Sequence, residues 1–142
     1  MENVTWSPPS MVQANTDYIP GEIAGFYQEA HDAFSIGAYR AVLLLARSVI
    51  EATAKLKNVG GSNLVKKIDN LHEEGHIRRG VKQVAHALRH IGNDIAHGDL
   101  TDPPTAEDAD DVLKLARMIL DDVYVADAVR VDILTRRGKP VD

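Results

Sequence analysis

The helical period of the apolar residues constrains this 142-residue chain more than any other feature of its sequence. Apolar residues recur every three or four positions, and no segment shows the strict alternation of a half-buried strand. Glycines and prolines interrupt the period at Gly37, Gly60-Gly61, Gly75, Gly98 and Pro103-Pro104. We therefore expect an all-α fold, a helical bundle of four to five main helices with mostly short connections.

The interruptions divide the chain into five predicted helices. The first four cover about 20–35, 38–57, 64–74 and 78–97. A fifth follows Thr105, which is a favourable N-cap residue, whereas Ser62 or Asn63 can cap the third helix. Residues 1–19 have no apolar period and are expected to form an extended N-terminal arm. The bundle then occupies 20–127, and the tail, 128–142, is compatible with a short helix.

The composition excludes several kinds of core and functional site. Aromatic residues make up 5% of the chain, so the core must be mostly aliphatic. The absence of cysteine excludes disulfides and thiolate sites. No signal peptide or membrane-spanning run is visible, and we expect a cytoplasmic protein that does not enter the membrane. The net charge of -5 argues against a general polyanion binder, although basic residues predominate between Lys55 and His97.

One face of the predicted fourth helix is unusually rich in histidine. At about 100° per residue, five polar side chains project within about 60° of one direction. They are His86, Arg89, His90, Asn93 and His97. The apolar residues of the same helix lie on the opposite side and are expected to face the core. The histidine-rich face must then meet solvent, a groove or a partner chain.

The predicted second helix carries a comparable polar stripe. Arg47 and Glu51 are four residues apart on it and can form an ion pair. Arg40, Lys55 and Asn58 project in nearly the same direction, away from the apolar side. A surface ion pair and a role in a binding site are both consistent with this stripe.

Three interpretations of the histidine-rich face remain open from the residues alone. His86 and His90 could share a metal ion, but His97 is too far along the helix and no third acidic ligand is evident, so we expect no metal site. Histidine with a nearby cation is also suited to phosphodiester cleavage, or simply to holding a phosphate. Finally, the stripe can serve as a symmetric dimer contact without chemistry.

Three segments of the chain, at 18–30, 41–51 and 88–97, resemble the domain of unknown function 4145. The most specific part is Arg47-Ser48-Val49-Ile50-Glu51 combined with Gly92-Asn93 and then His97. That family resembles a branch of the HEPN superfamily (higher eukaryotes and prokaryotes nucleotide-binding). The resemblance covers roughly residues 18–127, nearly the whole chain.

The resemblance implies a helical bundle that forms a homodimer. In active members it implies a metal-independent endoribonuclease without cofactor, whose arginine–histidine motifs from two protomers meet in one cleft. Carried onto this sequence, it implies His97 as the acid or base, Asn93 as a phosphate contact, and Arg89 or Arg47 as the cation. Glu51 would orient these groups. On the same face, His86 and His90 would support phosphate or RNA binding.

The sequence departs from the superfamily motif at one position, since Gly92 stands where the arginine usually lies. The expected protein is therefore an RNA- or nucleotide-phosphate-binding homodimer, either an endoribonuclease or its degenerate relative. The resemblance also implies a place in a toxin–antitoxin or antiphage defence system, with an antitoxin or another defence protein as partner. The alternative is a non-catalytic module for protein interaction or dimerisation.

Overall fold

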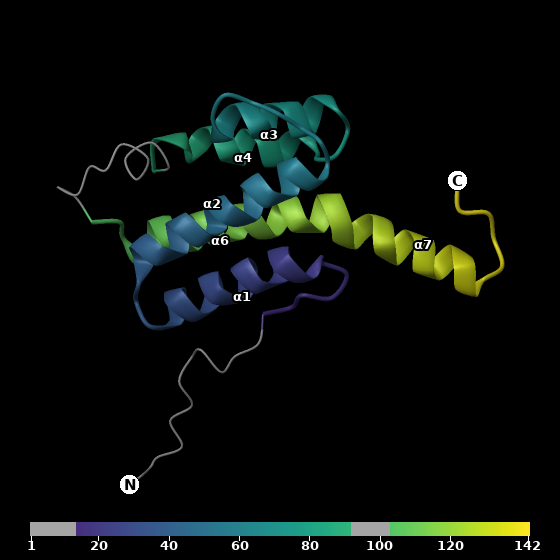
Figure 1. Cartoon of the computed structure of the whole chain (residues 1–142), viewed down its shortest axis with the longest axis horizontal. Helices are drawn as coiled ribbons and strands as arrows, with labels where there is room; N and C mark the ends of the chain where they lie inside the picture. The colour runs from purple at the N-terminus through teal and green to yellow at the C-terminus, as the bar shows by residue number, and fades with distance from the viewer. Residues whose placement is uncertain (1–13, 92–102) are drawn as a thin grey trace, which may run out of the picture.

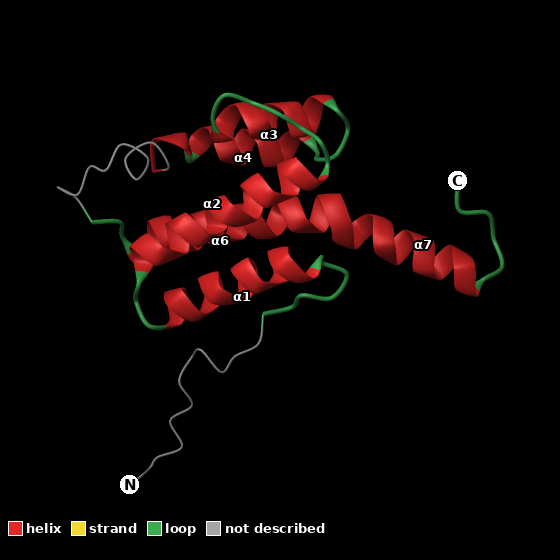
Figure 2. Ribbon diagram, in the orientation of Figure 1, coloured by secondary structure: helices red, strands yellow, loops and turns green. Residues whose placement is uncertain are grey.

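A computed structural model describes residues 14–91 and 103–142, and throughout these residues the regular structure is helical, with no strand (Figure 2). The predicted all-α class is therefore confirmed. The helices are α1 (Gly21–Ser35), α2 (Tyr39–Leu56), α3 (Leu64–Glu73), α4 (Arg79–Ala87), α6 (Ala106–Leu120), a π-helical turn η2 (Asp121–Val125) and α7 (Ala126–Arg136).

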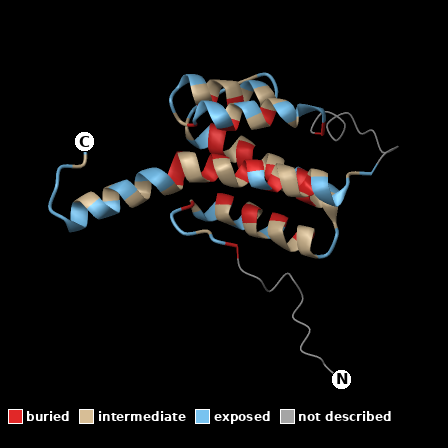
Figure 3. Ribbon diagram, turned by 180° about the vertical axis from the view of Figure 1, so that it is seen from behind, coloured by how far each residue is buried: buried red, intermediate tan, exposed pale blue. Residues whose placement is uncertain are grey.

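The helices pack around a central pair, α2 and α6. Helix α1 packs against α2 and α6, and the α3–α4 hairpin packs on the other side of the same pair (Figure 1). Buried residues follow the facing sides of these helices (Figure 3). The core is mostly aliphatic, as the low aromatic content predicts, and its largest fully buried apolar side chains are Ile23, Ile50, Ile68, Leu71, Ile119, Leu120, Val42, Val49 and Val81.

Two predicted caps set the starts of α3 and α6. Asn63 caps α3, since its side-chain oxygen accepts a hydrogen bond from the Lys66 backbone N–H at 2.8 Å. Thr105 and Asp108 form a reciprocal capping box at α6, with hydrogen bonds of 3.0 and 3.3 Å. These side chains satisfy backbone donors that the first helical turn leaves unpaired.

The sequence predicts one continuous fourth helix, and this prediction is wrong. Helix α4 ends at Ala87, Leu88 forms a turn, and helical structure resumes at 89–91. The backbone N–H of Leu88 is shared between the carbonyls of Val84 and Ala85, and the Ile91 N–H then bonds back to Leu88 at 3.1 Å. The bonding therefore tightens from the α to the 3₁₀ spacing, which ends the regular helix.

The C-terminal tail contains an 11-residue helix, α7, which is continuous with the bundle. Helix α6 passes through η2 directly into α7, which projects beyond the other helices (Figure 1). Helix α7 has no buried residue, and Ile133 is 44% exposed. The projecting helix therefore adds little to the core.

The described part of the predicted N-terminal arm packs against the bundle instead of extending from it. Ala14 and Ile19 are buried in the core cluster. The Ala14 N–H donates a hydrogen bond to Gln28 Oε1 at 2.9 Å, and Ile19 closes a turn by bonding to the Thr16 carbonyl. No helix among the described residues is both long and apolar enough to span a bilayer.

Candidate functional site

The outer face of α2 carries an ion-pair cluster built on Glu51. Glu51 Oε2 lies 3.4 Å from Arg47 Nε and 3.4 Å from Lys67 Nζ. The pairing of Arg47 with Glu51 that the sequence predicts is confirmed. Lys67 comes from α3 and joins the cluster because α3 packs beside α2.

The cluster has an excess of positive charge. One carboxylate serves two cations, and the side chains of Arg47, Glu51 and Lys67 are 33%, 37% and 26% exposed. Among the described residues, Arg47 uses only Nε in this cluster, so its terminal Nη groups remain as donors. An arginine with two such donors can bind a phosphate in a bidentate manner.

The loop before α3 packs closely against that helix, and this packing helps to position Lys67. The loop passes so near α3 that a Cβ on Gly61 would lie 2.7 Å from the Lys67 backbone nitrogen. Only glycine allows this approach without a shift of the backbone. The loop therefore holds α3, and with it Lys67, close to α2.

His86, on α4, faces the neighbouring helix α3. Its Nε2 is 2.6 Å from Asp69 Oδ1 on α3, and Lys82 Nζ is 4.0 Å from the same oxygen. The sequence did not indicate this carboxylate, because Asp69 is 17 residues from His86. Its side chain remains 39% exposed, but Asp69 holds it toward α3.

The outward direction of the next polar residues agrees with the sequence prediction. Arg89 and His90 are exposed, whereas Ile91 is buried. The turn at Leu88 separates them from α4. The directions of residues after Leu88 therefore do not follow from the projection of one continuous helix that begins before His86. The remaining members of the predicted site, Asn93 and His97, lie outside the described residues, as does Gly92.

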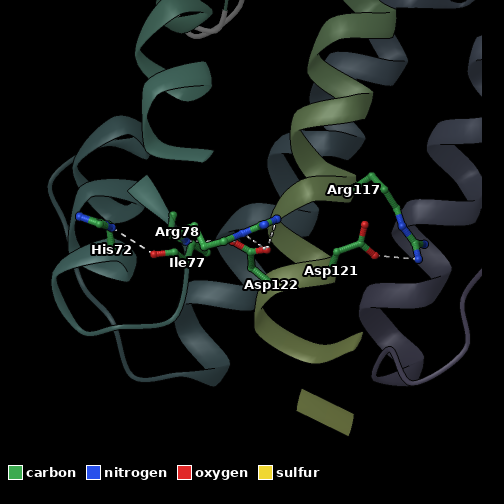
Figure 4. A network of polar contacts seen from close by, with 6 residues as sticks. All are labelled: His72, Ile77, Arg78, Arg117, Asp121 and Asp122. Atoms are coloured by element: carbon green, nitrogen blue, oxygen red, sulfur yellow. Dashed lines mark hydrogen bonds and ion pairs between the residues drawn. The ribbon is translucent and has the colours of Figure 1, made fainter. Parts of the chain in front are cut away.

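A second polar network, which the sequence did not indicate, surrounds η2 (Figure 4). Asp122 accepts hydrogen bonds from the backbone N–H of Arg78 at 2.9 Å and from its guanidinium at 2.9–3.2 Å. The Asp122 side chain is only 7% exposed. The hydrogen bonds that Arg78 donates to Asp122 raise the pKa of its guanidinium. This contact joins the start of α4 to the end of α6.

The neighbouring carboxylate, Asp121, points to the opposite side of η2 (Figure 4). It pairs with Arg117 at 2.9 Å, and Arg117 also donates to the Asn15 carbonyl. The guanidinium carbon of Arg117 lies 5.6 Å from the centre of the Tyr27 ring. Burial raises the pKa of Tyr27, while Arg117 opposes that rise. These contacts attach the N-terminal segment to α1 and α6.

Metal binding finds no support in the part of the chain that the structure describes. Across residues 14–91 and 103–142, no three His, Asp or Glu side chains converge closely enough to hold a metal ion. His86 and Asp69 form only a pair.

A family model described as a domain of unknown function (DUF4145) matches residues 28–137. The chain belongs to this family. The DUF4145 match begins within α1 and extends through α7, so it takes in the Glu51 cluster and the projecting helix. No curated protein and no solved structure matches the chain significantly.

Proposed function

We propose that this DUF4145 protein is a HEPN-like homodimer that binds RNA or nucleotide phosphates in a toxin–antitoxin or antiphage defence system. The observation that carries the proposal is the excess positive charge of the Glu51 cluster, where Arg47 and Lys67 share one carboxylate on an accessible face. Phosphate contacts supply most of the affinity of proteins for nucleic acid. Arg89 and His90 are also exposed on the described surface.

Glu51 has a positioning role in this proposal. Its carboxylate holds Arg47 Nε and leaves the terminal donors of Arg47 available for a phosphate. Asn93 and His97 would add the polar contact and the acid or base, and cleavage would require the histidine to move a proton at the ribose or the leaving group. The superfamily resemblance supports these two assignments.

The alternative, a module for protein interaction, draws support from a different observation. Helix α7 projects from the bundle without a buried residue, and Leu44, Leu56 and Ile133 are large apolar side chains on the described surface. A protein partner that covered such groups would remove apolar surface from water, which stabilises a complex. The experiment must therefore separate RNA binding from protein association.

The test measures binding of a fluorescein-labelled single-stranded 20-nucleotide RNA by fluorescence anisotropy over a range of salt concentrations. Arg47→Gln should weaken binding and lower the slope of log K against log salt by about 0.7, because one phosphate contact is lost. Lys114→Gln is the matched control, since Lys114 is 70% exposed on α6 and pairs with Asp110. A mononucleotide competitor distinguishes recognition of RNA from recognition of a phosphate alone.

His97→Ala provides the second arm. We expect it to abolish RNA binding or cleavage and to leave the dimer intact, as judged by light scattering. If His97→Ala instead dissociates the dimer, and the wild-type protein binds no RNA, the proposal is wrong and the interaction module is correct.

A further inference from the structure

A shallow, open cavity of about 410 Å³ lies beside the starts of α2 and α6. Both helices begin at the same end of the bundle (Figure 1). Its wall consists of residues 37–41 together with Pro103 and Pro104. The lining is mainly apolar, and its volume lies within the range of small-molecule sites, about 300–1,000 Å³. None of these residues belongs to the Glu51 cluster.

Tyr39, one of the lining residues, has a ring that packs against one neighbouring aromatic side chain. Tyr39 is half-buried, and its ring centre lies 5.7 Å from that of Phe34 at an interplanar angle of 50°. Proline rings, like aromatic rings, offer flat apolar faces, and Pro103 and Pro104 have no backbone N–H. The cavity therefore favours a flat, mainly apolar group and offers few hydrogen bonds that would reject one.

A cation lies at the rim of the cavity and connects it to the Glu51 cluster. Arg40 is exposed, lines the cavity, and has no ion-pair partner among the described residues. It shares the outer face of α2 with Arg47, seven residues and about 10.5 Å further along the helix axis. The acidic start of α6 lies beyond Pro104, and there Asp108 is already engaged in the cap of Thr105.

We propose that this cavity receives one unpaired nucleobase of a single-stranded RNA whose backbone follows the outer face of α2 from Arg40 toward Arg47. The inference rests on the RNA binding proposed above and names its substrate class. Single-stranded RNA is recognised by stacking splayed bases on aromatic side chains and arginines. A base combines a flat apolar face with an anionic backbone, and the cavity and the row of cations match these two features.

The test compares two labelled 12-nucleotide RNAs on the full-length protein, an oligouridine and a chain of the same length that lacks all bases. Both carry the same phosphates, so a site that binds only phosphate binds them equally. A base pocket should bind the oligouridine at least about fivefold more tightly, the lower limit for stacking of one base.

Ala41→Leu fills the cavity without removing a cation, since Ala41 is half-buried in its wall. It should lower the affinity for oligouridine to that of the baseless chain and leave the baseless chain unaffected. Ala52→Leu is the matched control, because Ala52 is also half-buried on α2 but does not line the cavity. Arg40→Gln should weaken binding of both RNAs.

If Ala41→Leu fails to fold, Tyr39→Leu serves instead, because leucine retains an apolar contact with Phe34 but cannot stack on a base. Equal binding of the two RNAs, with both dependent on Arg47, would overturn the base pocket and leave the proposed function standing. Loss of the dimer in Ala41→Leu with unchanged RNA affinity would assign the cavity to a protein contact and also overturn it. If neither RNA binds the wild-type protein, both proposals are wrong.

Discussion

His31 shows how the environment of one residue on α1 sets its protonation. Its ring meets the edge of Tyr27, with ring centres 5.0 Å apart. Burial lowers the pKa of His31 below its ordinary value, Arg117 adds to this effect, and the Asp32 carboxylate opposes it. His31 therefore binds a proton less readily in the folded protein than in the unfolded chain.

This difference predicts a pH dependence of stability. The unfolded chain takes up a proton at His31 near pH 6.5, whereas the folded protein does so only at lower pH. The free energy of unfolding should therefore fall as the pH decreases from about 7 to 5. We expect His31→Gln to reduce this fall, measured by urea unfolding at each pH. Identical pH profiles for the variant and the wild-type protein would contradict the assignment.

Spacing along a helix determines which contacts between individual residues the sequence can predict. The Arg47–Glu51 pair follows from residues four apart on one helix, and it forms as expected. Lys67 is 16 residues from Glu51, and Asp69 is 17 from His86, so neither contact is encoded in a helical repeat. Both depend on which face α3 turns toward α2 and α4, which tertiary packing decides.

At the scale of elements, η2 connects parts of the fold that are distant in sequence. Asp122 on η2 binds the backbone and the side chain of Arg78, 44 residues away. It thereby satisfies a donor at the start of α4, where no side chain of α4 itself provides a cap. The contact fixes the α3–α4 hairpin against the end of α6.

Removal of this contact should destabilise the protein markedly. We expect Asp122→Ala to lower the free energy of unfolding by about 2 kcal/mol, because a nearly buried carboxylate with several hydrogen bonds is lost. Asp110→Ala is the control, since Asp110 is 40% exposed and its ion pair with the exposed Lys114 should contribute far less to stability. Urea unfolding measures both. Equal losses in the two variants would show that Asp122 does not join the elements.

The bounds of the elements were predictable where the chain carries explicit signals. Asn63 and Thr105 mark the starts of α3 and α6, and Gly75 follows the end of α3. No glycine or proline marks the turn at Leu88, and the apolar period continues through it. The π-helical turn is equally absent from the sequence pattern, because α7, which follows it, has no buried apolar face whose phase would reveal the extra residue.

At the scale of the whole molecule, stability is concentrated in the bundle. Ile119 on α6 is fully buried, whereas Ile133 on α7 is 44% exposed. Ile119→Ala should lower the free energy of unfolding by about 2–5 kcal/mol, and Ile133→Ala by less than about 1 kcal/mol. Urea unfolding at low protein concentration provides the measurement. A large loss for Ile133→Ala would mean that α7 is covered in the native assembly.

The π-helical turn also affects which single-residue deletions the protein can tolerate during evolution. A π turn accommodates one residue more than the α-helical turn it replaces. Deletion of the codon for Val125, which follows the buried Val123 and Tyr124, would restore a regular helix and turn α7 by about 100° around its axis. Because α7 contributes no buried residue, the bundle could survive such a mutation while a different side of α7 met its surroundings. A change of one residue in length would thus alter the outer surface without repacking the interior.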